Sequence, residues 1–289
     1  MTEPLFEHRL TLAGLETRAL ELEGNGPPLV LLHGFADSAD TWRLVLDRLG
    51  RREQRALALD LPGFATAAPL DRGRGVLEQL DAFTAAAIEY AAGDRRERVV
   101  VGGNSLGGAL ALRAGERADP PLRGVVPIAP AGLDMPRWFQ LIERDPLVRF
   151  VLRSPLPLPE VAVRAVVGEA YRQLAFARPR AATGRVVASF TSHFRDRHAV
   201  ARYLDVGRRV LPELDEPFRL AEVRVPVLLI WGERDRMVSH RGAQRVVDAL
   251  PRTTYELLEG VGHCPQVEAP DRVVALLADF LAGPERRAA

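Results

Sequence analysis

The sequence predicts an α/β fold: a mostly parallel, doubly wound sheet with helices on both faces and an inserted helical cap. Three observations lead to this prediction. Apolar runs alternate with helical patterns over residues 27–131, the alternation breaks over residues 132–217, and it returns over residues 218–289. Because consecutive parallel strands bring their ends to one edge of a sheet, we expect a ligand site at that edge.

The elements follow in a regular order. An alternating pattern that turns at Gly14 predicts an antiparallel hairpin over residues 8–22. The continuous apolar runs after it are typical of buried parallel strands, and the segments between them have helical spacing and capping residues. Strands are expected over residues 27–34, 55–63, 97–104, 122–130, 225–235 and 253–260. Helices are expected over residues 38–50, 76–93, 105–118, 240–250 and 270–283.

The middle of the chain lacks this rhythm. Residues 132–217 have apolar residues at mixed three- and four-residue spacings, with proline interruptions such as RSPLPLPE, which predict helices. The segment leaves from the carboxyl end of a predicted strand, so we expect a cap over the ligand edge. A helical elaboration elsewhere on the sheet is the alternative. We therefore expect residues 1–131 and 218–289 to form the core, and residues 132–217 the cap.

The composition of the chain limits the kinds of binding partner that we expect. The formal net charge is +1, so no basic excess points to nucleic acid or to an anionic membrane surface. The chain has one cysteine, which excludes an intrachain disulfide. The N-terminus does not resemble a secretory signal, and no apolar run approaches the roughly 20 residues of a membrane span. We expect a soluble, cytoplasmic protein with a small-molecule partner, and leave its oligomeric state open.

The stretch VVVGGNSLGG fits two kinds of turn. A phosphate-binding P-loop would need lysine and then serine or threonine where Gly108 and Ala109 stand, and the chain contains no lysine. A dinucleotide-binding pattern fails because Asn104 replaces its second glycine. Residues 103–107 instead match G-x-S-x-G between a β-branched strand and an alanine-rich helix. Ser105 is therefore the candidate nucleophile, with a plain serine helix cap as the alternative.

A serine hydroxyl needs a base to act as a nucleophile. His263 lies in a glycine-containing loop after the last predicted strand, and Asp235 follows the strand before it. A carboxylate beside the histidine would fix its tautomer, so Ser105, Asp235 and His263 form the candidate triad. Asp134 is the second candidate for the acid and Glu233 the third. No histidine pair has the H-E-x-x-H spacing of zinc enzymes, so we expect no metal site, and we expect no other cofactor.

An acyl-transfer site also needs donors for an oxyanion. The N–H of Leu106, directly after the serine, and the N–H of Phe35, after the first core strand, are the candidates. Further side chains are expected to contact substrate at the sheet edge or from the cap. These are His33, Gly34, Asn104, Trp138 and Phe139.

Taken together, LLHGF, DLPGF, GNSLGG, WGERD and GVGHCPQVEAP resemble the α/β-hydrolase superfamily, in its capped serine esterase and C–C hydrolase-like branches. The resemblance implies a hydrolase with the triad above. Serine at position 105 argues against epoxide hydrolases and haloalkane dehalogenases, which use aspartate there. Asn104 beside Ser105 resembles the G-N-S-M-G-G of meta-cleavage-product hydrolases. However, HGFADSADTW lacks their glycine-proline-glycine, and Cys264 replaces their usual tryptophan.

Ester hydrolysis therefore comes first among the activities that the resemblance implies. We expect carboxylic esters with small to medium apolar groups, because Trp138, Phe139, Leu141, Phe150 and Leu152 make the expected cap apolar. C–C bond hydrolysis of meta-cleavage-type diketones is the alternative, and cofactor-free haloperoxidase chemistry is a side reaction of the same fold. A small-molecule receptor with residual hydrolysis is the alternative of another class. An intact triad disfavours a purely adhesive protein.

Overall fold

An eight-stranded sheet forms the centre of the computed structural model, which describes residues 5–118, 121–135, 159–179 and 183–283. Its strand order is β1-β2-β4-β3-β5-β6-β7-β8. The pairs β1–β2 and β2–β4 are antiparallel, and the other neighbours are parallel, which confirms the predicted fold class. The strands are β1(Leu5–Leu12), β2(Leu15–Leu22), β3(Leu29–Leu32), β4(Ala56–Leu59), β5(Val99–Asn104), β6(Leu122–Ile128), β7(Leu228–Gly232) and β8(Thr254–Leu258).

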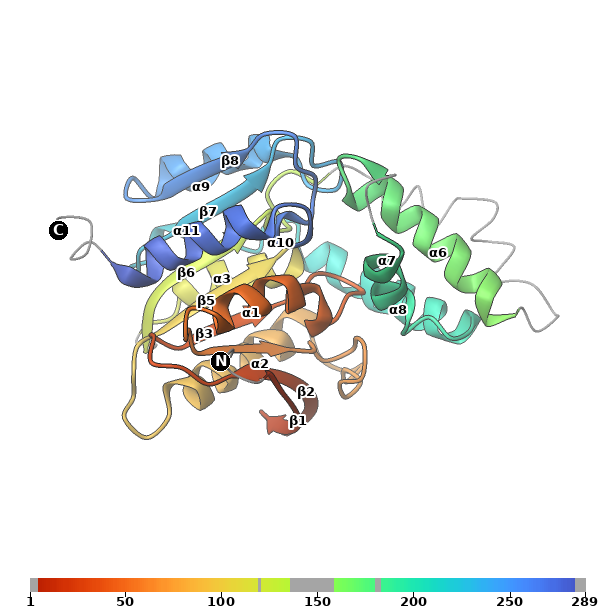
Figure 1. Ribbon diagram of the computed structural model, residues 1–289, viewed down its shortest axis with the longest axis horizontal. Coiled ribbons are helices and arrows are strands. Elements are labelled where there is room, and N and C mark those ends of the chain that lie inside the picture. The colour runs from red at the N-terminus through yellow and green to blue at the C-terminus, as the bar shows by residue number, and fades with distance from the viewer. Residues whose placement is uncertain (1–4, 119–120, 136–158, 180–182, 284–289) are drawn as a thin grey trace.

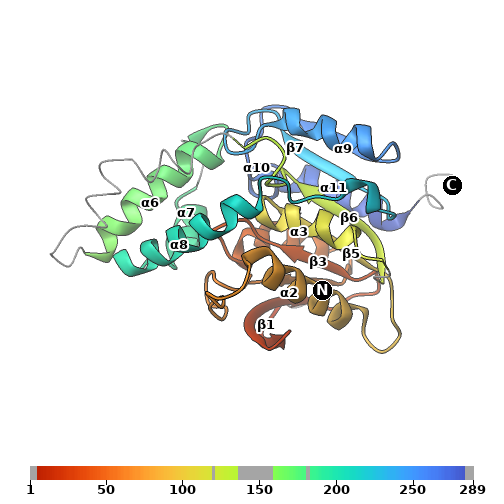
Figure 2. The ribbon, with the colours of Figure 1, turned by 180° about the vertical axis from the view of Figure 1, so that it is seen from behind.

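Helices cover both faces of the sheet. One face packs against α1(Arg43–Gly50) and α11(Pro270–Ala282), which lie in front of the sheet in Figure 1. The other packs against α2(Val76–Ala92), α3(Leu106–Gly115) and α9(Ala243–Ala249), seen from their own side in Figure 2. The remaining short helices of the core are η1(Ala39–Trp42), η3(Leu220–Glu222), η4(His240–Gly242) and α10(Pro265–Glu268).

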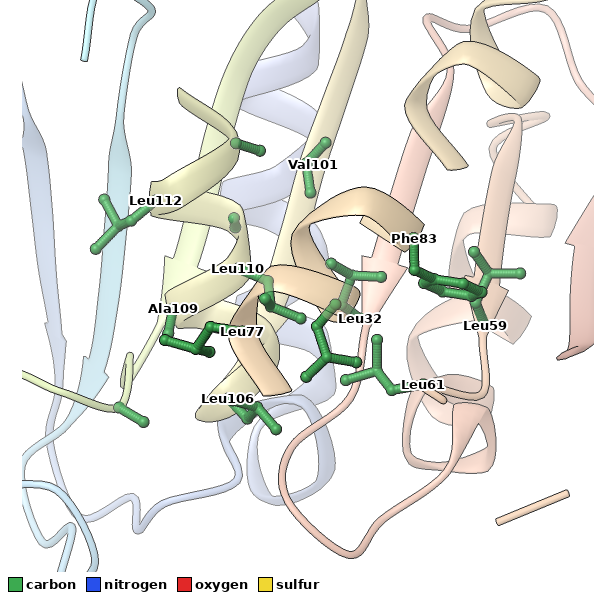
Figure 3. Packing of buried hydrophobic residues seen from close by; sticks show 14 of the residues in the cluster. Leu32, Leu59, Leu61, Leu77, Phe83, Val101, Leu106, Ala109, Leu110 and Leu112 are labelled. Atoms are coloured by element: carbon green, nitrogen blue, oxygen red, sulfur yellow. The ribbon is translucent and has the colours of Figure 1, made fainter. Parts of the chain in front are cut away.

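The sequences of β3, β4 and β7 are apolar throughout because both faces of the sheet are buried there. Along β3, Val30 and Leu32 join the cluster on the α2 and α3 face, while Leu29 and Leu31 join the cluster on the α1 and α11 face. Alternation of this kind follows from the period of two in a strand. Figure 3 shows side chains of the first cluster from both layers: Leu32, Leu59 and Val101 from the strands, and Leu77, Phe83 and Leu110 from the helices.

The segment between β6 and β7 is rich in helices in its described part. It contains α6(Glu160–Ala175), α7(Gly184–Thr191) and α8(Arg197–Glu213), which lie together beyond the carboxyl ends of the parallel strands (Figures 1 and 2). This is the position expected of a cap, while the boundaries at residues 132 and 217 remain a prediction. Trp138, Phe139, Leu141, Phe150 and Leu152 lie outside the described residues. Within the described residues, no helix is long and apolar enough to cross a membrane.

Candidate active site

Ser105 occupies a strained turn between β5 and α3. Its backbone has φ 55° and ψ −114°, a conformation that residues other than glycine rarely adopt. Two glycines make the turn sterically feasible. A Cβ atom on Gly103 would lie 2.2 Å from the carbonyl oxygen of Gly107, and one on Gly107 would lie 2.3 Å from that of Leu32. Neither position can therefore hold a side chain without moving backbone.

The side chain of Ser105 is not used to cap α3, because it makes no capping hydrogen bond. The backbone around it is well bonded: its N–H donates to the carbonyl of Ile128 over 2.9 Å, and its carbonyl accepts from the N–H of Ala131 over 3.0 Å. Ser105 also lines an apolar cavity of about 150 Å³. The turn thus presents the serine to a cavity, as a nucleophile would require.

His263 and Asp235 form a buried pair. The Nδ1 atom of His263 lies 2.7 Å from Oδ2 of Asp235, and their side chains are 4% and 0% exposed. The other oxygen, Oδ1, accepts hydrogen bonds from the N–H groups of Met237 and Val238, so the carboxylate is held on both sides. An ionised carboxylate can only accept, so Nδ1 carries the proton. Nε2 is left unprotonated, buried and without a hydrogen-bond partner in the described structure, as a general base needs.

The other two acid candidates lie elsewhere. Asp134 is exposed, and its backbone carbonyl accepts from the N–H of Ser239. Glu233 is also exposed, and its Oε2 accepts from the N–H of Gly260 over 2.9 Å. The structure thus brings Asp235, and neither of these two, to the ring of His263.

Asn104 ties the nucleophile strand to the loop of the base. Its Nδ2 donates to the carbonyl of His263 over 2.9 Å and to that of Ile128 over 3.3 Å. Its Oδ1 accepts from Nε2 of Gln266 over 3.2 Å. Asn104 does line the cavity, as a substrate-binding residue would, but its amide is already engaged. The G-N-S resemblance therefore has a structural explanation, which is the anchoring of the His263 loop.

The loop after β3 lies directly against the serine. A Cβ atom on Gly34 would sit 3.2 Å from Cβ of Ser105, and both Gly34 and Phe35 line the cavity. The ring of Phe35 packs edge-on against that of Phe64, with centroids 5.3 Å apart. Phe35 lines the cavity together with Ser105, and Leu106 directly follows Ser105 in the sequence. The roles of the Phe35 and Leu106 N–H groups as oxyanion donors remain a prediction.

His33 supports this loop from beneath. It is fully buried, its Nε2 accepts from the N–H of Leu61 over 2.7 Å, and its Nδ1 donates to the carbonyl of Gly34 over 2.7 Å. Burial lowers the pKa of His33 to about 4, so the ring is neutral at neutral pH. His33 does not line the cavity in the described part of the chain. This arrangement favours loop support over the substrate contact expected from the sequence.

The cavity is apolar and roofed by the cap. Its volume is about 150 Å³. Cap residues on α6, α7 and α8 face the core residues across it, chiefly Val167, Tyr171, Leu174, Phe190, Tyr203 and Leu204. A smaller hollow of about 30 Å³ also borders Ser105 and Phe35, with Met135, Val210 and Leu214 in its wall. The sequence did not lead us to predict these cap residues. Their spacing along α6 and α8, which puts them on one helix face, is the feature that could have identified them.

Two further residues of the site were missed. Asp37 lines the cavity as a buried acid, and Gln266 is buried below it. In the sequence, only their closeness to candidate residues could have identified them: Asp37 lies near Phe35, and Gln266 lies near His263. No motif distinguishes either residue from a structural one. Over the described ranges, no cluster of three or more histidine, cysteine or acidic side chains could hold a metal ion.

Comparison with known proteins agrees with this geometry. The alpha/beta hydrolase family model matches residues 29–276. The pimeloyl-[acyl-carrier protein] methyl ester esterase of Xanthomonas campestris pv. campestris (strain B100) is 30% identical over 270 residues, 91% of this chain and 98% of that protein. A bacterial membrane phospholipase A superposes with a TM-score of 0.78 and 25% identity, covering 96% of this chain and 86% of that one.

A second solved structure has the same fold. It is the 2-hydroxy-6-oxo-6-phenylhexa-2,4-dienoate hydrolase of Rhodococcus sp. strain RHA1, with a TM-score of 0.76 and 21% identity. The superposition covers 98% of this chain and 100% of that one. At this identity the likeness concerns the fold alone. The family match spans most of the sequence and includes the turn of Ser105 and the loop of His263. The chain therefore belongs to the alpha/beta hydrolase family.

Proposed function

We propose that the protein hydrolyses carboxylic esters of small to medium apolar acids or alcohols through an acyl-enzyme on Ser105. The observation that carries the proposal is the strained Ser105 at an apolar cavity that also exposes His263, which is bonded to a fully buried Asp235. Esterase and lipase relatives support it, since the curated relatives include a pimeloyl-[acyl-carrier protein] methyl ester esterase and a lipase.

In the first step, Oγ of Ser105 attacks the ester carbonyl while Nε2 of His263 takes its proton. Asp235 stabilises the imidazolium that forms. The N–H groups of Phe35 and Leu106 hold the oxyanion of the tetrahedral intermediate. When the intermediate collapses, the alcohol leaves with the proton from His263, and the acyl group stays on Ser105.

In the second step, water replaces the alcohol. His263 takes a proton from the water as the water oxygen attacks the acyl carbonyl, and the same N–H groups hold the second oxyanion. Collapse returns the proton to Oγ of Ser105 and releases the carboxylic acid. The apolar walls of the cavity favour an apolar acyl or alkyl group by burial.

C–C bond hydrolysis of meta-cleavage-type diketones is the second candidate, favoured by Asn104 beside Ser105. The hydrogen bonds of Asn104 to the His263 loop reduce the weight of this resemblance, because they give the residue a structural role. Epoxide hydrolysis has less support, although Epoxide hydrolase EphH of Mycobacterium tuberculosis (strain ATCC 25618 / H37Rv) is 32% identical over 190 residues, 62% of this chain and 84% of that protein. Serine at position 105 argues against that reaction.

A panel of p-nitrophenyl esters of increasing chain length, run beside a meta-cleavage dienoate, tests the proposal. We expect ester cleavage by the wild type and its loss in Ser105→Ala, whereas the matched control Ser192→Ala, outside the cavity, retains it. A wild type no faster than Ser105→Ala would contradict ester hydrolysis and favour a small-molecule receptor. Faster cleavage of the dienoate than of every ester would favour the C–C hydrolase.

A further inference from the structure

The cavity wall holds a carboxyl group that ester hydrolysis does not use. Asp37 follows the loop after β3, is 6% exposed, and lines the cavity with Ser105 and His263. Its Oδ1 accepts a hydrogen bond of 2.8 Å from the N–H of Ser38, and the Thr41 side chain bonds to it as well. The carboxyl group is therefore fixed in the wall.

The partners of Asp37 are fixed in turn. Nε2 of Gln266 donates to Oγ1 of Thr41 and to Oδ1 of Asn104, over 3.2 Å in both cases. Because Thr41 accepts from Gln266, its own hydroxyl proton is available for Asp37. This network leads through Asn104 to the carbonyl of His263. Asp37 thus belongs to a hydrogen-bond network that also includes Thr41, Gln266 and Asn104.

No positive side chain balances Asp37 at the cavity. The chain is rich in arginine, yet none lines the cavity over the described ranges. From the facing elements, burial raises the pKa of Tyr171 on α6 and of the Cys264 thiol above their usual ranges, so both groups are neutral. Asp40 and Asp60 act on Asp37 as negative charges, and both are paired with Arg18.

Burial also raises the pKa of Asp37, to about 7. At pH 8.5 the group is therefore mostly ionised, in a wall otherwise formed by apolar and neutral polar side chains. Charges within such a wall are only weakly screened by salt, in contrast to charges at the surface.

We propose that Asp37 selects substrates by charge: the cavity takes uncharged acyl groups and rejects acyl groups that carry a carboxylate. The inference rests on the proposed ester hydrolysis and narrows its substrate class. A carboxylate beside an ionised Asp37 in a poorly solvated cavity is disfavoured, and protonation of Asp37 at pH 8.5, against its pKa of about 7, limits the discrimination to roughly thirtyfold. The same repulsion acts against a meta-cleavage dienoate, which is itself a carboxylate.

The test compares esters of equal acyl length. We would measure kcat/KM at pH 8.5 for p-nitrophenyl hexanoate and mono-p-nitrophenyl adipate, and for the butyrate and succinate pair, with wild type and Asp37→Asn. We expect the wild type to prefer the neutral member of each pair by roughly thirtyfold, and Asp37→Asn to reduce that preference at least fivefold. Asp47→Asn, an exposed carboxylate on α1, is the matched control and keeps the wild-type ratio.

An equal preference in wild type and Asp37→Asn would overturn the inference while leaving ester hydrolysis intact. If the wild type cleaves no ester, binding still decides the question. Calorimetric titration of Ser105→Ala at pH 8.5 with methyl hexanoate and with monomethyl adipate gives the same comparison without turnover. We expect monomethyl adipate binding to strengthen at least fivefold relative to methyl hexanoate when Asp37→Asn is added, and no change would overturn the inference.

Discussion

Nδ2 of Asn104 donates a hydrogen bond of 2.9 Å to the backbone carbonyl of His263, so the residue before the candidate nucleophile Ser105 holds the loop of the candidate base. The two residues lie far apart in sequence and meet at the carboxyl ends of β5 and β8. The bond fixes the position of the histidine main chain, while Asp235 fixes its ring. The carboxyl end of β5 thus positions both the candidate nucleophile and the loop of the candidate base.

Asn104→Ala removes this anchor and leaves the triad side chains in place. We expect kcat on a p-nitrophenyl ester to fall roughly 10- to 100-fold, because a small displacement of the base weakens proton transfer. KM should change less than kcat, since the cavity walls remain. Thermal unfolding of the variant separates this effect from loss of fold, and an unchanged kcat would show that the bond does not position His263.

Asp235→Asn removes the charge that stabilises the imidazolium and permits the wrong histidine tautomer. We expect kcat to fall roughly 10³- to 10⁴-fold. The exposed Asp134→Asn variant should keep the wild-type kcat, as should Glu233→Gln. Steady-state kinetics of the three proteins would assign the acid, and a large loss only in Asp134→Asn would overturn the assignment to Asp235.

Gly103→Ala tests the steric basis of the serine turn. The added methyl group would meet the backbone of Gly107 at 2.2 Å, so we expect the free energy of unfolding to fall by about 3 kcal/mol or more. Gly184→Ala is the matched control, since a Cβ there has open space at the start of α7. Urea denaturation monitored by circular dichroism should show a loss of stability for the first variant only.

Asp37 should also make stability depend on pH. Its pKa is about 7 in the folded protein, against an ordinary value of 3.8, so the folded state binds more protons between these values. The contribution of Asp37 to stability therefore falls as pH rises from about 4 to 7. At pH 8 we expect Asp37→Asn to raise the free energy of unfolding by about 4 kcal/mol, with little effect near pH 4. A constant difference across urea titrations at these pH values would contradict this explanation.

Sequence reasoning predicted the core well because local pattern and burial agree there. Continuous apolar runs such as residues 29–32 and 99–101 identify strands with two covered faces, and the structure contains them. The antiparallel pairing of β2 with β4 was not predicted, because nothing in either strand specifies its neighbour. The short helix α10 was likewise read as part of a loop, since four residues are too few for a period.

The site was predictable where a motif fixes geometry. Ser105 and His263 occupy turns whose glycines mark them in the sequence, and Asp235 follows a strand end that lies beside theirs. Asp37 and Gln266 carry no such mark, because the importance of Asp37 comes from its burial in the cavity wall and that of Gln266 from contacts across more than 100 residues of chain, as in its bond to Asn104. Tyr171 and Phe190 stack at the cavity with centroids 3.7 Å apart, a contact that no local pattern encodes.

The carbonyl of Ala175, the last residue of α6, accepts a hydrogen bond of 2.8 Å from the N–H of His263. The neighbouring N–H of Ala177 is bonded to Oε2 of Glu268, whose Oε1 accepts from the N–H of Gly262. The loop of the candidate base His263 is thus supported partly by the cap. For protein engineering, this means that replacing the cap by that of a relative would also replace the backbone groups that hold the loop of the candidate base. Chimeras joined inside residues 175–177 should therefore lose turnover even when both parents are active, whereas junctions at the strand ends should preserve it.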